Sequence, residues 1–377
     1  MFFDELLDET YCPNEYPALD ALCGEWSETR PFEGLRILVA TPIFRNTMVE
    51  YRALMAGGAE LAIGRATHPD EDEKDVASMP CDKKILDYLV ENGMKFYSVK
   101  DVVREESDGK YFDLILDCAG QFAACHPKIG FVELTRSGVH FYENVKQPVY
   151  VADSGIVKRI ETSLGTGDGY FRALIQLGYS DFESRKLLVF GSGKVGSGIA
   201  LQGLSKGCSV TVVTDTTKKG TSTDFCATLE QNDIDILDCR DYTATVAAIQ
   251  SADYIVTATG VKDALVNPIL TQALLATKAK LSNMGVEDEY GAGVPADKVL
   301  NGKAPLNFIL EEPTHLKYIE TSMALHAALG ECLVRDSRFE GLKEPPAELE
   351  EMLLMATIQN GVIGTEICGM LGLSPDF

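Results

Sequence analysis

The feature that most constrains the fold is an apolar segment that runs directly into a glycine-rich turn. Lys186-Leu-Leu-Val-Phe190 is followed by Gly191-Ser-Gly193-Lys-Val-Gly196, and an apolar stretch then continues through Leu204. This order predicts a buried strand, a tight turn and a helix, which together form one unit of a helix-covered parallel sheet. The sequence therefore predicts an α/β protein.

The same turn predicts a dinucleotide site. Gly191 permits the tight turn, Gly193 lets backbone amides approach a pyrophosphate, and Gly196 allows close packing of helix and strand. Lys194 and Val195 open the predicted helix, whose N-terminus favours phosphate charge. The alternative is a purely structural turn without a ligand.

Asp215 closes the next predicted strand, Ser209–Thr214. A carboxylate at this place accepts hydrogen bonds from the adenosine ribose, which favours NAD over NADP. Lys218 and Lys219 leave NADP open as an alternative, because they would neutralise a 2′-phosphate.

Small and amide side chains follow two further predicted strands, Tyr254–Thr257 and Lys280–Asn283. The carboxyl ends of parallel strands present such residues to a bound ligand. Four residues are therefore predicted to contact the cofactor near its nicotinamide: Thr257, Thr259, Gly260 and Asn283.

Alternating strand and helix patterns also occupy the first part of the chain, beginning with a strand over 35–40, a helix over 46–57 and a strand over 59–64. We expect two domains with a doubly wound parallel sheet: a substrate domain over 1–163 and an NAD-binding Rossmann domain over 164–327. Residues 328–377 are expected to be helical and to return to the substrate domain or to a partner subunit. The glycines over 165–169 predict a bend with a hinge close to it. We expect the active site in a cleft between the domains.

Composition excludes several classes of function. With 34 basic and 57 acidic residues the net charge is −23, and no basic patch indicates a nucleic-acid or anionic-membrane partner. None of the ten cysteines forms a Cys-x-x-Cys pair, so we expect free thiols and no metal site. An acidic N-terminus and the lack of a long apolar run predict a cytoplasmic protein. We expect a homo-oligomer that acts on a small molecule.

Several motifs, in their order along the chain, resemble one family. They are Ile115-Leu-Asp117-Cys-Ala-Gly120, Ser137-Gly-Val-His140-Phe-Tyr142, Asp153-Ser154 with Gly165, Val256-Thr-Ala-Thr-Gly260 and Ser282-Asn283-Met-Gly285. They are similar to Ile-Leu-Asp-Asp-Gly-Gly, Thr-Gly-Val-His-x-Tyr, Asn-Asp-Ser…Tyr-Gly-Cys, Val-Thr-Thr-Thr-Gly and Cys-Asn-Ile-Gly of S-adenosylhomocysteine hydrolase. The resemblance implies two domains and a tightly held NAD that transiently oxidises the substrate's 3′-hydroxyl.

The chain departs from that family at its acid–base residues. The two histidines of the family fall on Pro42 and Val286, and the second aspartate of the Asp-Asp-Gly-Gly run falls on Cys118. A gapless match places the family's catalytic lysine at Val157, one residue before Lys158. The family's basic C-terminal tail has no counterpart in residues 374–377. The resemblance therefore implies a divergent member that lacks several catalytic residues.

Six residues are candidates for catalysis: Lys158, Glu161, Asp153, Asp117, His315 and His326. Lys158 could hydrogen-bond an alcohol or ketone oxygen during hydride transfer, with the two nearby carboxylates orienting it or acting as base. Each candidate has a structural alternative: a solvated lysine, surface carboxylates, a helix-capping Asp117, and histidines packed in a core.

We therefore expect an NAD-dependent redox enzyme acting on a small polar metabolite. One alternative is a true S-adenosylhomocysteine hydrolase with relocated acid–base groups, for which His315 and His326 are the replacements to consider. The other is an NAD-binding regulatory protein without turnover.

Overall fold

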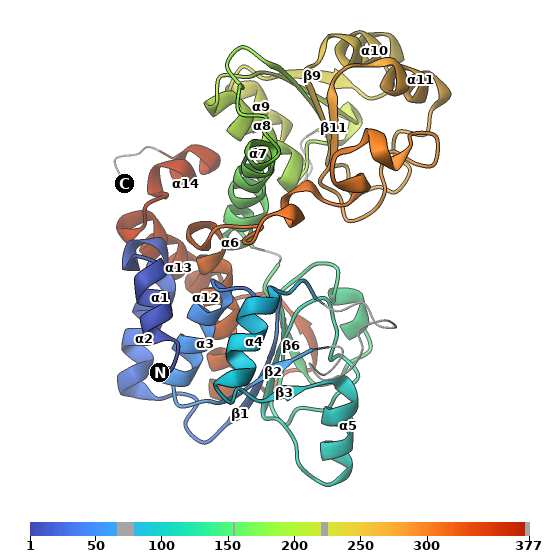
Figure 1. Ribbon diagram of the computed structural model, residues 1–377. Coiled ribbons are helices and arrows are strands. Elements are labelled where there is room, and N and C mark those ends of the chain that lie inside the picture. The colour runs from blue at the N-terminus through green and yellow to red at the C-terminus, as the bar shows by residue number, and fades with distance from the viewer. Residues whose placement is uncertain (66–78, 154, 220–224, 374–377) are drawn as a thin grey trace. The chain divides into compact units, whose positions relative to one another are not determined.

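The computed structural model describes residues 1–65, 79–153, 155–219 and 225–373. The chain divides into two compact units (Figure 1). The first unit comprises 1–158 and 316–365, and the second comprises 159–315 and 366–377. Ser154 of the Asp-Ser motif, and the tail over 374–377, lie outside the described residues.

The first unit contains a seven-stranded sheet in the order β12-β6-β5-β4-β1-β2-β3. Every neighbouring pair in this order is parallel. Chain order reverses between β1 and β4, which makes the sheet doubly wound. The strands are β1 (Arg36–Ala40), β2 (Glu60–Gly64), β3 (Phe96–Tyr97), β4 (Leu114–Asp117), β5 (Gly130–Glu133), β6 (Pro148–Val151) and β12 (Gly341–Lys343).

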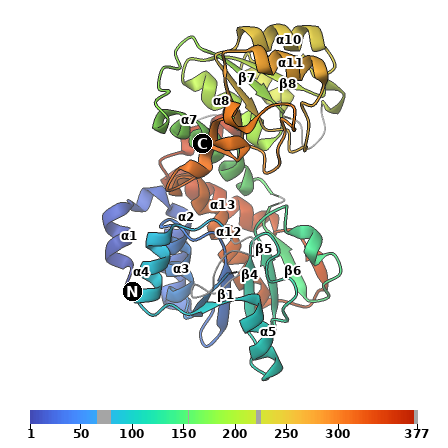
Figure 2. The same ribbon diagram turned by 45° about the vertical axis from the view of Figure 1, so that its right-hand side comes forward.

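Helices pack on this sheet and on one another (Figure 2). The long helix α12 contacts β4 and β5, and a Cβ added at Gly330 would lie 3.4 Å from the Leu116 side chain. The helices are α1 (Asp4–Thr10), α2 (Pro17–Thr29), α3 (Thr47–Ala56), α4 (Lys83–Glu91), α5 (Val99–Ser107), α12 (Leu316–Arg335) and α13 (Ala347–Asn360). Helices α6 (Val157–Arg159) and α14 (Gly364–Leu371) cross the two unit boundaries.

The second unit contains a five-stranded parallel sheet in the order β11-β10-β7-β8-β9. This is the Rossmann order. The order in which the strands are added to the sheet reverses between β7 and β10, although all the strands are parallel. The strands are β7 (Lys186–Phe190), β8 (Ser209–Thr214), β9 (Asp235–Asp238), β10 (Tyr254–Thr257) and β11 (Lys280–Asn283). The predicted α/β class with a doubly wound parallel sheet is confirmed.

Helices cover both faces of this sheet. Successive residues of a strand point to opposite faces, so neighbouring residues of β7 pack against different helices. Leu187 and Val189 pack with α7 (Thr166–Gln176), α8 (Lys194–Ser205) and α9 (Cys226–Gln231). Leu188 and Phe190 pack instead with α10 (Tyr242–Ser251) and α11 (Pro268–Ala276). Both faces are therefore apolar, as the unbroken apolar run of β7 predicts.

The glycines over 165–169 do not form the predicted bend. They lie in a continuous helical segment, with a π-helix over Ile160–Gly165 that leads into α7. A Cβ added at Gly167 would lie 2.6 Å from the backbone oxygen of Gly198, so the glycine permits close packing of α7 on α8. The prediction of a local bend was wrong because close helix contact selects glycine as well.

The C-terminal part differs from the expected pattern in two places. The apolar residues over 308–310 predict a short strand, but a short 3-10 helix occupies Leu306–Ile309 instead. Conversely, β12 interrupts the helices expected after residue 328 and pairs with β6. Three apolar residues are too few to separate a strand from a helical turn by periodicity.

No helix among the described residues is long and apolar enough to cross a membrane.

Candidate functional site

The turn after β7 has the geometry that its glycines predict. Gly191 has a φ of 108°, a region that residues with a side chain rarely adopt. A Cβ at Gly196 would overlap the backbone oxygen of Gly191, so helix α8 can approach the turn only with glycine there. Lys194 and Val195 form the first turn of α8, as predicted.

Gly193 differs from these two glycines because a Cβ there would meet no described atom within 4 Å. It precedes the first residue of α8, and no described side chain caps the helix at this position. The first backbone N–H groups of a helix lack partners within the helix and favour anions. Because Gly193 has no side chain, the space beside the N-terminus of α8 is not filled by this residue.

A pocket of about 430 Å³ lies at this turn. Its lining comes from the carboxyl ends of four strands: residues 190–193 after β7, 213–215 at β8, Cys239 after β9, and Ala258 and Thr259 after β10. This is the switch point of the sheet, where open α/β sheets bind ligands. The volume is within the ordinary range of small-molecule sites.

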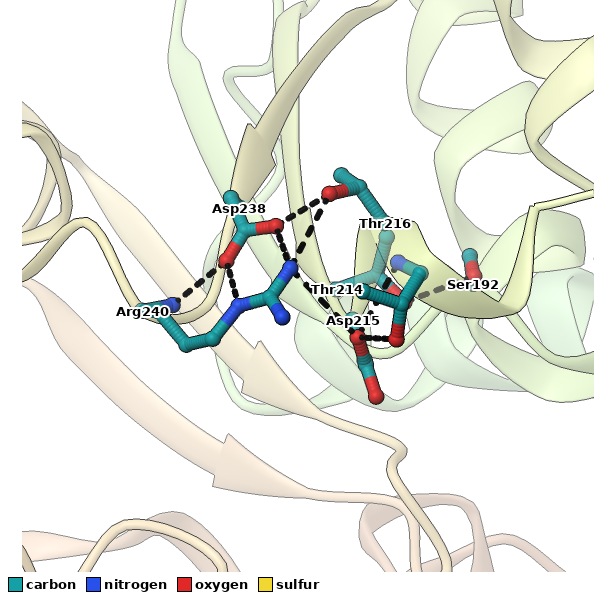
Figure 3. A network of polar contacts seen from close by, with 7 residues as sticks. Ser192, Thr214, Asp215, Thr216, Asp238 and Arg240 are labelled. Carbon is teal, nitrogen blue, oxygen red and sulfur yellow. Dashed lines mark hydrogen bonds and ion pairs between the residues drawn. The ribbon is translucent and has the colours of Figure 1, made fainter.

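Asp215 follows the last residue of β8 (Figure 3). It lines the pocket. Its Oδ1 accepts hydrogen bonds from the backbone N–H of Thr217 at 3.1 Å and from the Thr217 hydroxyl at 2.5 Å. These hydrogen bonds lower the pKa of Asp215, so the carboxylate is ionised at neutral pH. Its Oδ2 has no hydrogen-bond partner among the described residues and remains available to a ligand.

Two residues at the carboxyl end of β9 were not predicted to belong to the site. Asp238 accepts hydrogen bonds from Arg240 and from the Thr216 hydroxyl, and the Arg240 guanidinium reaches Asp215 (Figure 3). Sequence reasoning missed them because β9 itself was not predicted. The apolar pair Ile236-Leu237 before Asp238 is the signal that could have found the strand.

The side chains at the ends of β10 and β11 are hydrogen-bonded to each other. The Thr257 hydroxyl donates to Oδ1 of Asn283 at 2.9 Å, and both side chains are fully buried. The Asn283 amide donates to three backbone oxygens, including that of Lys303 at 2.7 Å. These two predicted contact residues therefore stabilise the strand ends, while Thr259 lines the pocket.

A buried carboxylate that was not predicted supports the loop after β10. Glu289 accepts hydrogen bonds from the backbone N–H groups of Thr259 at 2.9 Å and of Gly260 at 2.7 Å. Burial raises the pKa of Glu289. The backbone N–H of Gly260 is thus hydrogen-bonded to Glu289, and Gly260 contributes to the conformation of the loop.

In the first unit, Asp117 ends β4 beside β1, at the switch point of that sheet. It is fully buried and accepts hydrogen bonds from the N–H groups of Cys118 and Phe122 and from the Tyr142 hydroxyl. Burial and the charge of Glu133 raise the pKa of Asp117 to about 7. These contacts fit the structural alternative, in which Asp117 holds the turn after β4.

His326 is fully buried in α12. One ring nitrogen lies 2.9 Å from the Glu50 carboxylate, and the other lies 3.3 Å from the backbone oxygen of Val132. Burial lowers the pKa of His326, but the Glu50 carboxylate outweighs this and raises it above the ordinary value. Both nitrogens are thus occupied, as in the alternative of a packed core histidine.

The other catalytic candidates belong to different units. Asp153 and Lys158 lie in the first unit and are buried, with Lys158 only 3% exposed. Glu161 and His315 lie in the second unit, where His315 is 3.6 Å from the carboxylate of Asp168. The buried position of Lys158 does not match the solvated alternative. The catalytic roles and the cleft between the domains stay predictions.

Part of the second unit matches a known protein family. Residues 179–284 match a family described as putative NAD(P)-binding. These residues include β7 through β11 and the whole glycine turn. Among solved structures, a dipicolinate synthase chain from Bacillus halodurans aligns with a TM-score of 0.47 at 12% identity, over 81% of this chain and 99% of that chain.

The chain is also similar to two kinds of hydrolase. It is 27% identical over 224 residues to S-inosyl-L-homocysteine hydrolase of Methanopyrus kandleri, which is 52% of this chain and 50% of that protein. It is 28% identical over 226 residues to adenosylhomocysteinase of Sulfolobus acidocaldarius, again 52% of this chain and 50% of that protein. The match spans about half the length of these curated relatives. The chain therefore contains an NAD(P)-binding domain and is a divergent relative of the adenosylhomocysteinases, as its motifs predict.

Proposed function

We propose that the pocket of the second unit binds NAD and that the protein uses it in a redox step on a small polar metabolite. The observation that carries the proposal is the pocket itself, which joins an open Gly193, the N-terminus of α8 and the ionised Asp215. The N–H groups of α8 would hold the pyrophosphate, and Asp215 would accept hydrogen bonds from the adenosine ribose. Bound NAD supplies a hydride acceptor, which no side chain provides.

The chain must supply the proton chemistry of such a reaction. We assign Lys158 the role of hydrogen-bonding the substrate oxygen, with Asp153 and Glu161 as the carboxylates that orient it or accept the proton. His315 beside Asp168 is the second candidate for a proton carrier. The small-molecule substrate, the homo-oligomer and the cytoplasmic location remain predictions.

The direct test is to purify the protein, release any bound nucleotide and identify it by mass spectrometry. We expect NAD, or binding of added NAD with a micromolar or lower dissociation constant. Small polar alcohols are then screened for an absorbance change of the nicotinamide. Protein that binds neither NAD nor NADP would contradict the proposal. NAD binding without turnover of any substrate would favour the regulatory alternative.

The first site prediction concerns Lys158. Lys158→Met is expected to leave NAD affinity unchanged and to lower kcat by about 10²-fold or more, because a hydrogen bond made in the transition state is lost. Turnover and NAD binding are measured on the same preparations once a substrate is known. Lys146→Met, which removes an exposed lysine of the same unit, is the matched control. Full activity of the Lys158 variant would return this residue to a structural role.

The second site prediction concerns Asp215. Asp215→Ala is expected to weaken NAD binding by about tenfold, because a charged hydrogen-bond acceptor for the ribose is removed. NADP binding should weaken less, since the same change removes a repulsion against the 2′-phosphate. Calorimetric titration with both cofactors measures the difference. Asp235→Ala serves as control, because Asp235 lies at the opposite end of β9. Equal losses for both cofactors would show that Asp215 does not bind the ribose.

A further inference from the structure

Two charged residues line the described part of the pocket near the ends of β8 and β9, and two more lie next to a lining residue. Asp215 and Lys218 line the pocket directly, and Cys239 places the end of β9 in the same wall. Asp238 and Arg240 precede and follow Cys239 in the sequence. Their side chains pair with each other near Asp215 (Figure 3). Four charged groups thus surround the place proposed above for the adenosine ribose.

Asp238 accepts hydrogen bonds from two nitrogens along one edge of the Arg240 guanidinium. Nε of Arg240 donates to Oδ1 of Asp238 at 2.7 Å, and Nη2 donates to Oδ2 of the same carboxylate. The backbone N–H of Arg240 also donates to Oδ1 at 2.8 Å. Such a bidentate pair with a local backbone contact fixes both the position and the direction of the guanidinium.

The same guanidinium also approaches Asp215, which lines the pocket. Its Nη2 lies 3.7 Å from Oδ1 of Asp215 and 3.5 Å from the Thr216 hydroxyl. In NADP the ribose 2′-hydroxyl that Asp215 would bind is replaced by a phosphate. Arginine is the side chain best suited to bind a phosphate, because its N–H groups match two oxygens at once. Arg240 is therefore placed where it would favour NADP, unless another group occupies its N–H donors.

We propose that Asp238 is a specificity-determining residue of the cofactor site. By holding Arg240 in a bidentate pair, Asp238 withholds the guanidinium from a 2′-phosphate, while Asp215 repels that phosphate directly. Selectivity for NAD then depends on two carboxylates, and removal of Asp215 alone leaves Arg240 engaged. This inference rests on the proposed binding of NAD in this pocket.

The test compares NAD and NADP dissociation constants in three variants by calorimetric titration. Asp215→Ala/Asp238→Asn is expected to bind NADP about tenfold more tightly than Asp215→Ala, because the freed guanidinium gains a charged hydrogen bond. Adding Arg240→Gln should remove this gain. The gain should also shrink as the salt concentration rises, since the site is open to solvent.

Asp215→Ala/Asp235→Asn is the matched control, because it makes the same charge change on β9 away from the pocket, and no gain is expected. Thermal unfolding checks that each variant folds, and Asp238→Ser replaces Asp238→Asn if that variant does not. Equal NADP affinity with and without Asp238 would overturn the inference, as would a gain that persists without Arg240. A wild-type protein that binds neither cofactor would overturn the proposed function itself, and the inference with it.

Discussion

Gly193→Val is expected to abolish NAD binding and leave the second unit folded. A Cβ at Gly193 meets no described atom within 4 Å, so the branched side chain would project into the space beside the N-terminus of α8. That space is where backbone amides would approach the pyrophosphate. Displacing a doubly charged group from these amides should raise the dissociation constant by about 10²-fold or more, at about 1.4 kcal/mol for each factor of ten.

Two other glycines separate loss of binding from loss of folding. Gly196→Val should destabilise the protein, because a Cβ there would overlap the backbone oxygen of Gly191. Gly24→Val introduces the same side chain in the first unit, at a position with no described neighbour within 4 Å, and should bind NAD normally. Thermal unfolding and NAD titration distinguish the three variants. A folded Gly193→Val protein with unchanged NAD affinity would disprove the cofactor site.

The sequence was informative about the cofactor site because backbone geometry leaves few choices there. Gly191 has a positive φ and Gly196 is in close contact with backbone, so both positions require glycine. The apolar run of β7 identifies a strand buried on both faces, and this fixes the register of the turn that follows it. Such local requirements are readable from one sequence without any knowledge of distant residues.

The groups that were missed depend on distant contacts. Glu289 supports the loop after β10 through N–H groups thirty and twenty-nine positions earlier in the chain. Arg240 acquires its place only because β9 pairs with β8, and β9 has an acidic residue at each end that weakens its apolar pattern. The pair Ile236-Leu237 could indicate the strand itself, but neither its pairing with β8 nor the contacts of Glu289 have a signature in local residue order.

The local sequence is ambiguous in a similar way at the glycines over 165–169 and at His326. The glycines over 165–169 are compatible with a bend or with close packing of a helix. Gly167 packs against the backbone of Gly198 in α8, and Gly169 packs against the backbone of Pro313. His326 is compatible with catalysis or with burial, and its pairing with Glu50, 276 positions away, fits burial. The missing information in each case is tertiary.

The residues at the family's histidine positions bear on the competing hydrolase function. Pro42 follows β1 in the first unit, and Val286 follows β11 in the second, where its side chain is 90% exposed. Neither side chain carries a titratable proton. Cys118, at the position of the family's second aspartate, is buried beside Asp117 and donates its backbone N–H to that carboxylate. Three groups that would move or hold protons in that chemistry are therefore replaced.

We accordingly expect the purified protein, supplied with NAD, to release almost no adenosine or homocysteine from S-adenosylhomocysteine. Each general acid or base contributes about 10²- to 10⁴-fold, so the loss of two predicts a rate lower by about 10⁴-fold or more. Chromatographic detection of both products measures it, and an adenosylhomocysteinase under the same conditions is the positive control. S-inosyl-L-homocysteine is tested in parallel, because relatives at 25–27% identity carry that name. Rapid release of homocysteine from either compound would establish the hydrolase alternative.

His315→Asn would then show whether the histidine beside Asp168 has taken over the role of the missing acid or base. If it has, the rate of hydrolysis should fall in this variant while the affinity for NAD stays unchanged.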